Sequence, residues 1–189
     1  MKNLLHYIEK HYVLKDPDIH LLKQCFKIDD LPPRSKLLKA GMTERYLYFL
    51  DKGIIKGYQN VDGKLVVQHL IAESEFFTSL DSYMSGTPSA DYFETITQSR
   101  VFKLSRPDFE LLQNKITFWN DFVKRITTRH LNCKLERVKD FQTLSARERY
   151  LKFITQNPVL ALNVPVENIA SFLGMEPQSL SRIRKQIIF

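Results

Sequence analysis

The first 28 residues carry apolar side chains at the spacing of two short helices. The two apolar groups are Leu4, Leu5, Ile8 and Tyr12, followed by Ile19, Leu22 and Phe26. Between them, Asp16 is expected to act as the N-cap of the second helix and Pro17 as its first residue, because proline has no N–H to leave unpaired there. Pro32-Pro33 then closes the helical region, since proline cannot continue a helix.

The spacing changes between residues 36 and 104, where short aromatic and β-branched runs alternate with turn residues. The expected strands are Tyr46–Leu50, Ile54–Tyr58, Leu65–Ile71, Phe93–Ile96 and Val101–Leu104. The turns between them are Asp51-Lys52-Gly53, Asn60-Val61-Asp62-Gly63 and Gln98-Ser99-Arg100. The pair Asp62-Gly63 is a strong hairpin signal. The region therefore predicts an antiparallel sandwich or barrel, and with the flanking helices an α+β chain.

A long segment, Glu75–Tyr92, interrupts the predicted strands. Long insertions in a β domain often form ligand loops, so this one is a candidate effector pocket, although a packing insertion is equally consistent with it. The residues expected to line the pocket are Glu75, Phe76, Phe77, Ser79, Ser85, Thr87 and Ser89.

A long helical region follows Pro107, with a cap near Ser105 or Arg106, and extends to about Phe141. Its apolar stripe consists of Ile116, Trp119, Phe122, Val123 and Ile126, continued by Leu131, Leu135, Val138 and Phe141. A helix of this length cannot bury its stripe on one small domain, so a second copy of the chain is the expected partner. The residues expected at this dimer contact are Trp119, Phe122 and Ile126. The alternative is a helix that packs only on its own β domain.

The C-terminal part begins with a capping box, Ser145 to Glu148, which opens a helix over Ala146–Thr155 that ends before Pro158. A pair of helices joined by a tight turn follows. Ile169, Ala170 and Leu173 form the inward face of the first, Gly174 takes the left-handed turn position, and Leu180 and Ile183 face inward on the second. Glu176 is the expected N-cap of the second helix and Pro177 its first residue.

The second helix of this pair presents a polar and basic outer face, which suits DNA bases and phosphates. Its residues are Gln178, Ser179, Ser181, Arg182, Arg184 and Lys185. Helix, glycine turn and basic helix together predict a DNA-binding helix-turn-helix, with a generic helical hairpin as the alternative.

Charge supports that prediction. The net charge is +7 over 189 residues. Residues 1–117 hold 16 Lys/Arg and 15 Asp/Glu, whereas residues 118–189 hold 12 and 6, so the last third carries most of the excess. A clustered basic excess indicates a polyanionic partner, with a solvated basic surface as the alternative.

The segment IASFLGMEPQSLSRIRK, from Ile169 to Lys185, resembles the DNA-binding signature of the Crp/Fnr family of bacterial regulators. YFLDKGIIKGY and VFKLSRPDFELL resemble the cyclic-nucleotide-binding-like jelly roll of the same family. The resemblance implies a sensor domain over residues 1–115, a dimerisation helix over 116–144 and a helix-turn-helix domain over 145–189. It also implies that Arg182 reads guanine and that Gln178 reads a second base.

The sequence departs from the family in two places. The segment EFFTSLDSYMSGTPSADYFETI lacks the Gly-Glu and Arg-Ser/Thr pairs with which cyclic-nucleotide binders hold the ribose and the phosphate, so we expect no response to cyclic AMP. The chain also stops at Ile187-Ile188-Phe189, where the family adds a β-wing, which predicts a truncated or absent wing.

Other functions have less support. Catalytic motifs are absent from the sequence and the five histidines are scattered, so an enzyme is not expected. Neither cofactor nor metal is expected, because Cys25 and Cys133 are too few for an iron–sulfur centre. The expected partners are double-stranded DNA and a second copy, with an unidentified small-molecule effector and RNA polymerase as further candidates and no membrane. The expected location is the cytoplasm. The alternative is a ligand-binding or protein-interaction module that has lost DNA binding.

Overall fold

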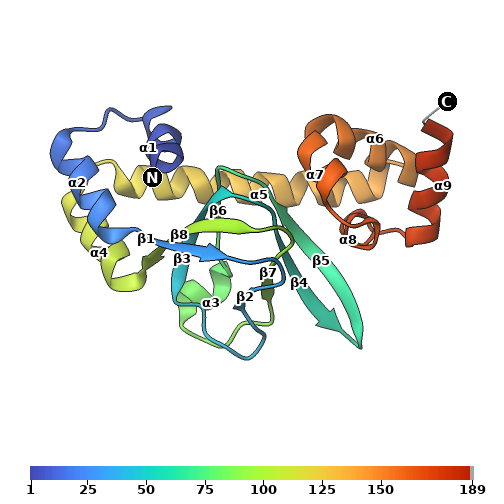
Figure 1. The fold of residues 1–189 in the computed structure, drawn as a ribbon, viewed down its shortest axis with the longest axis horizontal. Coiled ribbons are helices and arrows are strands. Elements are labelled where there is room, and N and C mark those ends of the chain that lie inside the picture. Colours follow the sequence, from blue (N-terminus) through green and yellow to red (C-terminus); the bar gives the residue numbers. More distant parts are fainter. Residues whose placement is uncertain (188–189) are drawn as a thin grey trace.

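Two four-stranded antiparallel sheets occupy the middle of the molecule, which the computed structural model describes over residues 1–187 (Figure 1). Their strand orders are β1-β8-β3-β6 and β2-β7-β4-β5. The strands are β1 (Lys27–Leu31), β2 (Lys36–Leu38), β3 (Tyr46–Lys52), β4 (Ile55–Val61), β5 (Lys64–Ile71), β6 (Glu75–Phe77), β7 (Tyr92–Thr95) and β8 (Ser99–Ser105). The predicted α+β fold with an antiparallel jelly roll is confirmed.

The hairpin between β4 and β5 forms at the predicted dipeptide. Asp62 and Gly63 have φ angles of 52° and 82°, the left-handed values that a two-residue hairpin turn requires. The strands around the turn are longer than the sequence suggested, since Val61 already pairs with Lys64. The expected four-residue turn is therefore two residues too long.

Strands β1, β2 and β6 were not expected from the sequence. β1 reads KIDDL, with no apolar alternation, and pairs with β8. Two ion pairs cross to that neighbour, from Lys103 to Asp29 at 2.8 Å and from Arg100 to Asp30 at 2.7 Å. Because the pairing depends on residues about 70 positions away, the local sequence carries little signal for it.

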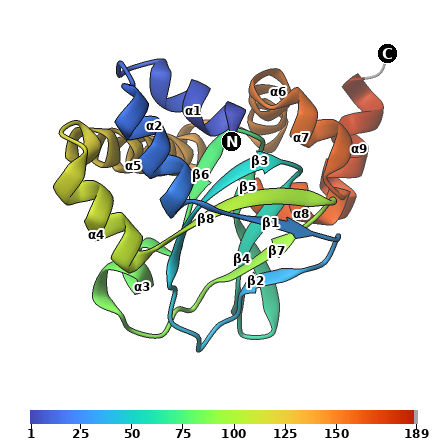
Figure 2. The same ribbon diagram turned by 60° about the vertical axis from the view of Figure 1, so that its left-hand side comes forward.

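The helices lie around the sheets, most of them at the two ends of the molecule (Figures 1 and 2). They are α1 (Lys2–Glu9), α2 (Asp16–Cys25), α3 (Leu80–Ser85), α4 (Arg106–Lys115), α5 (Trp119–Thr143), α6 (Ala146–Gln156), α7 (Pro158–Asn163), α8 (Val166–Phe172) and α9 (Pro177–Ile187). Helix α5 runs along the length of the molecule and connects α1, α2 and α4 at one end with α6 to α9 at the other. No helix of residues 1–187 is long and apolar enough to cross a membrane.

The long helical region after Pro107 is two helices rather than one. α4 starts at the expected cap, where the Ser105 hydroxyl accepts from the Asp108 N–H at 3.3 Å, and ends at Lys115. Ile116 then adopts an extended conformation, with φ of −106° and ψ of 114°. Ile116 and Trp119 both lie in the same apolar core, as the predicted stripe requires, but a single continuous helix was the wrong prediction, because the chain is extended at Ile116 and α5 starts only at Trp119.

The expected dimer residues lie inside the protomer, which corrects the sequence prediction. Trp119, Phe122 and Ile126 are 0%, 1% and 9% exposed. Phe122 packs edge-to-face on Phe76, with ring centroids 5.5 Å apart, under a layer formed by α1, α2 and α4. The first turns of α5 therefore complete the core of their own domain, and a second copy has no access to them.

One smaller expectation also fails. Asp16 is the first residue of α2 and Lys15 is its N-cap. The carboxylate that supports this helix start belongs to Asp18, which accepts from the Lys15 N–H at 3.1 Å.

The expectation of a missing wing depends on Ile188 and Phe189, which lie outside the described residues.

Candidate nucleic-acid interface

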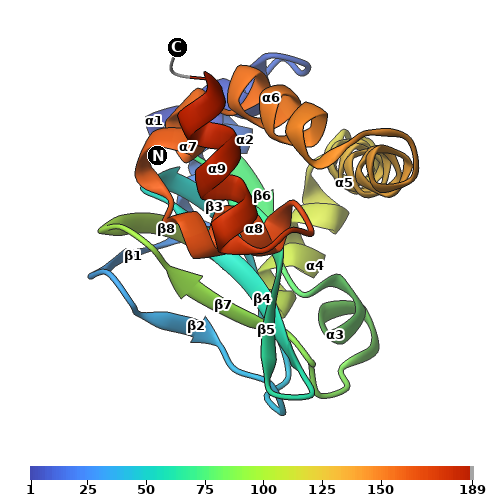
Figure 3. The same cartoon turned by 90° about the vertical axis from the view of Figure 1, so that its right-hand side faces the viewer.

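The C-terminal helices α6 to α9, residues 146–187, form one compact group that we call the HTH unit (Figure 3). Its entry is the predicted capping box: the Ser145 N–H donates to Glu148 Oε2 at 2.8 Å, and the Glu148 N–H donates to Ser145 Oγ at 3.3 Å. Hydrogen bonds from the Ser145 side chain and, second, from the Ser145 backbone N–H lower the pKa of the Glu148 carboxyl. Helix α7, which starts at Pro158, was not expected from the sequence.

The turn between α8 and α9 has the geometry that Gly174 allows. Its φ is +64°, and the Met175 N–H donates to Ala170 O at 3.0 Å while the Gly174 N–H donates to Ser171 O at 3.1 Å. This pair of bonds is the Schellman arrangement that ends a helix. A Cβ at Gly174 would also lie 2.7 Å from the Phe141 ring. Both the positive φ and this close contact therefore exclude larger residues.

Helices α8 and α9 pack through the residues that the sequence assigned to their inward faces. Ile169, Ala170 and Leu180 are fully buried and Leu173 is 6% exposed. Ile183 is half-buried against the same cluster. Ala170 allows the two helices to approach closely because it has only a methyl group. The two helices have the arrangement expected of a helix-turn-helix.

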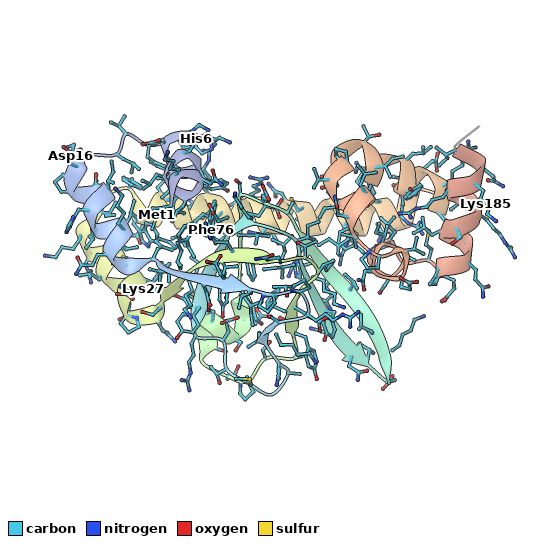
Figure 4. The ribbon with its side chains drawn as sticks, in the orientation of Figure 1. Met1, His6, Asp16, Lys27, Phe76 and Lys185 are labelled. Atoms are coloured by element: carbon cyan, nitrogen blue, oxygen red, sulfur yellow. The ribbon has the colours of Figure 1, made fainter. Side chains whose placement is uncertain are left out.

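The outer face of α9 is open to solvent over most of its predicted DNA-contacting residues. Gln178, Ser179, Ser181, Arg182 and Lys185 are all exposed. The Lys185 side chain projects away from the rest of the protein (Figure 4). Within residues 1–187, Arg182 makes no side-chain hydrogen bond or ion pair, whereas the Ser181 hydroxyl donates to Pro177 O at 2.9 Å in its own helix. Arg182 and Lys185 are the two cations that α9 offers to solvent.

Arg184 lies elsewhere, which corrects its assignment to the outer face. It is half-buried, its Nε donates to the Tyr150 hydroxyl at 3.0 Å, and its guanidinium lies over the Tyr150 ring at 5.6 Å. A second nitrogen reaches the carbonyl oxygen of Ala161 at 3.4 Å. Arg184 therefore joins α9 to α6 and α7, and it supports the fold of the HTH unit.

Four of the seven residues expected to line an effector pocket are buried. Phe76 and Phe77 form β6, with 1% and 4% exposure, and Phe77 stacks on Tyr48 at 5.0 Å. Ser79 and Ser89 are buried, and their hydroxyl oxygens lie 2.8 Å apart in a hydrogen bond. The remaining members of the set are Glu75, whose pKa burial raises, and the exposed pair Ser85 and Thr87.

Two surface hollows, of about 660 and about 290 Å³, lie elsewhere. The larger separates α2 from α4, and the smaller lies beside Thr43–Tyr46 and the start of α4. None of the seven predicted pocket residues lines either hollow. Within residues 1–187, no three His, Cys, Asp or Glu side chains gather as a metal site.

Sequence reasoning missed how the HTH unit attaches to the sheets. Ile54, Tyr58, Val67 and Leu70 from β4, β5 and the turn before β4 share one buried cluster with residues of α6 to α9. The sequence signal was present, since Ile54, Tyr58 and Leu70 are apolar, but it did not indicate which helices would cover them.

Solved structures with the same fold are known. FixK2 from Bradyrhizobium japonicum superposes with a TM-score of 0.76 at 16% identity, over 86% of this chain and 84% of that one. The c-di-GMP-responsive global regulator CLP from Xanthomonas campestris gives 0.71 at 15% identity, over 92% and 91%. A protein of Eubacterium rectale described as a transcriptional regulator of the Crp/Fnr family gives 0.70 at 9%, over 92% and 83%.

Sequence comparisons add nothing to this result. No protein-family model matches the chain, and no curated protein matches it by sequence. The fold assignment depends on the three solved structures, which show that the chain has the Crp/Fnr regulator fold along most of its length.

Proposed function

We propose that this chain, which has the fold of the Crp/Fnr regulators, is a homodimeric regulator that binds specific DNA sequences through α9. The observation that carries the proposal is the open polar face of α9, with Arg182 and Lys185 exposed on the second helix of a helix-turn-helix. In that motif the second helix enters the major groove and its side chains reach the base edges.

The base-reading residues are Gln178 and Arg182. They lie four positions apart, so both project from one face of α9. Arginine forms two parallel hydrogen bonds with guanine O6 and N7, and glutamine does the same with adenine N6 and N7. Ser179 and Lys185 hold phosphates, whereas Arg184, bonded to Tyr150, contributes only through the shape of the HTH unit.

The dimer contact is the second half of α5. Leu131, Leu135 and Val138 are 55%, 58% and 52% exposed, at spacings of four and three residues. That spacing is the seam of a two-stranded coiled coil, so a second copy covers these side chains about a two-fold axis. Paired α5 helices would place two copies of α9 about 34 Å apart, the separation of successive major grooves.

The sensor domain does not respond to cyclic AMP or cyclic GMP. The segment Glu75–Tyr92 supplies no arginine for a cyclic phosphate, and two of its aromatic residues fill the core. We expect calorimetry to detect no low-micromolar binding of either nucleotide.

The test is selection of a binding site from random DNA followed by substitution on α9. Arg182→Ala should lose about 1–3 kcal/mol of binding free energy on the selected site and relax the preference at one base pair. Lys185→Ala should weaken selected and random DNA alike and reduce the salt dependence of binding by about one unit of slope. Arg147→Ala, which removes an exposed arginine of α6, is the matched control and should change neither.

Two results would contradict the proposal. Equal losses on selected and random DNA for Arg182→Ala would remove its base-reading role. Failure of the wild-type chain to select or shift any DNA at low salt would favour a protein-interaction module that has lost DNA binding.

A further inference from the structure

The free edge of the second sheet is closed by a helix of the HTH unit. β5 is the last strand of that sheet, so no strand within residues 1–187 pairs with its outward N–H and C=O groups. The Ser171 hydroxyl of α8 occupies that place: it accepts from the Val67 N–H at 2.9 Å and donates to Leu65 O at 3.1 Å. One side chain therefore satisfies two backbone groups of the edge strand.

Three further contacts surround Ser171. Arg137 of α5 donates to Gln68 O of β5 at 2.5 Å and lies over the Phe172 ring of α8 at 4.9 Å. Lys64, the first residue of β5, pairs with Glu176 at 3.2 Å, immediately before α9. α8 thus contacts β5 along its length, with α9 beyond it on the outer side (Figure 3).

The apolar contact behind these bonds is continuous with the core of the HTH unit. Val67 of β5 is 2% exposed, and it belongs to the same buried cluster as Ile169 and Leu180. A swing of the HTH unit away from the sheet would expose this cluster to water, which opposes free rotation of α9.

From this geometry we propose that Ser171 is a positioning residue for DNA binding, and that the β5 edge holds α9 at a fixed place relative to the dimer axis. The inference rests on the proposed function. Two reading helices must reach two half-sites at once, so a fixed spacing strengthens binding to the paired site and has no effect on a single half-site.

The experiment compares Ser171→Ala with the wild-type chain on two DNAs, the selected paired site and one isolated half-site. Loss of the hydroxyl removes both hydrogen bonds to the edge strand, so it should weaken binding to the paired site at least about fivefold and leave half-site affinity unchanged. Ser171→Thr keeps the hydroxyl and should restore the paired-site affinity. Thr155→Ala is the matched control, because that hydroxyl bonds only within α6.

Hydrogen exchange of the Val67 amide measures the contact between Ser171 and β5 in the absence of DNA. It should exchange about fivefold faster in Ser171→Ala and at the wild-type rate in Ser171→Thr and Thr155→Ala. Faster exchange of the Val67 amide with unchanged paired-site affinity would overturn the positioning role. Higher paired-site affinity in Ser171→Ala would also overturn it, because it would mean that contact with the β5 edge hinders DNA binding by the HTH unit.

A loss shared by the paired site and the half-site would also overturn the positioning role, because it would indicate general damage to the HTH unit. An unchanged exchange rate would remove the contact on which the inference is built. A wild-type chain that selects no DNA at all would overturn the proposed function, and this inference with it.

Discussion

The two halves of α5 carry the same apolar spacing and meet different surroundings. In the first half, Trp119, Phe122 and Ile126 are at most 9% exposed, and they close the core beneath α1, α2 and α4. In the second half, Leu131, Leu135 and Val138 are at least 52% exposed. The apolar face of α5 changes surroundings after Ile126, the last of its residues in the core with α1, α2 and α4.

This difference shows that spacing along a helix identifies an apolar face and gives no information about what covers it. The first half is held by aromatic packing, with Trp119 and Phe122 ring centroids 5.3 Å apart. The second half is held to its own chain by polar groups, such as Lys152 of α6, whose Nζ lies 2.7 Å from both Glu136 and Asp140. The two halves should therefore respond differently to substitution.

The largest effect is expected in the first half. Trp119→Ala removes a fully buried ring and should lower the free energy of unfolding by about 3–5 kcal/mol. Chemical denaturation with urea measures the loss. Val13→Ala, at a position 87% exposed, should stay within about 0.5 kcal/mol of the wild type. A loss below about 1 kcal/mol for Trp119→Ala would contradict the core assignment.

In the second half the expected effect is on assembly. Leu135→Lys places a charge in the proposed seam and should convert the dimer to a monomer by sedimentation velocity at micromolar concentration, with an unchanged circular dichroism spectrum. Leu162→Lys is the matched control, since Leu162 is 85% exposed on α7 outside the stripe. A dimer that survives Leu135→Lys would place the contact elsewhere.

The contact between the second half of α5 and His69 of β5 should be sensitive to acid. Burial, with repulsion from Lys134 and Arg137 of α5, lowers the pKa of His69 to about 4. The unfolded chain binds this proton near pH 6.5, so the stability contributed by neutral His69 is complete above that pH and is lost as the pH falls toward 4. The difference between the two pKa values corresponds to roughly 3 kcal/mol of stability.

The measurement is the stability difference between His69→Gln and the wild type, which should move in favour of the variant between pH 7 and pH 4. The comparison at each pH is necessary because Glu44 titrates in the opposite sense. Burial raises the pKa of Glu44 to about 7, so its contribution is lost as the pH rises from 4.5. A difference that does not change with pH would show that His69 is solvated.

The smallest effect is expected at the polar contact of the second half. Lys152→Met should cost about 0.5–1 kcal/mol, because a partly exposed ion pair contributes little in water. The loss should shrink in 1 M salt, where charges are screened, whereas the Trp119→Ala loss should not. Equal salt sensitivity of the two variants would remove the contrast between the halves.

Local sequence patterns alone were sufficient to predict several features of the fold and of the candidate site. The hairpin at Asp62-Gly63, the caps at Ser105 and Ser145, the Gly174 turn and the exposure of Arg182 all depend on a few neighbouring residues. Turn conformation, capping and helix faces are short-range properties, which explains why a single sequence predicts them.

Other features required residues that are distant in the chain. Arg184 is of a residue type that often contacts DNA, but it donates a hydrogen bond to Tyr150, 34 positions away in the chain. Phe76 and Phe77 were expected in a ligand loop, but pairing with β3 makes them core. No local rule could have separated these outcomes, because the groups that decide them, Tyr150 and strand β3, lie far along the chain from Arg184 and from β6.

The sequence by itself determined the order of the elements, the faces of the helices and the basic C-terminal part, because these follow from residue type and spacing. Only the tertiary structure decided which half of α5 is already covered, where Arg184 is bound and that Ser171 closes the β5 edge. The physical reason is that burial is a property of pairs of surfaces. For Arg184 and Ser171 the second surface lies more than 30 residues away along the chain, and for Leu131, Leu135 and Val138 no part of residues 1–187 buries the exposed face.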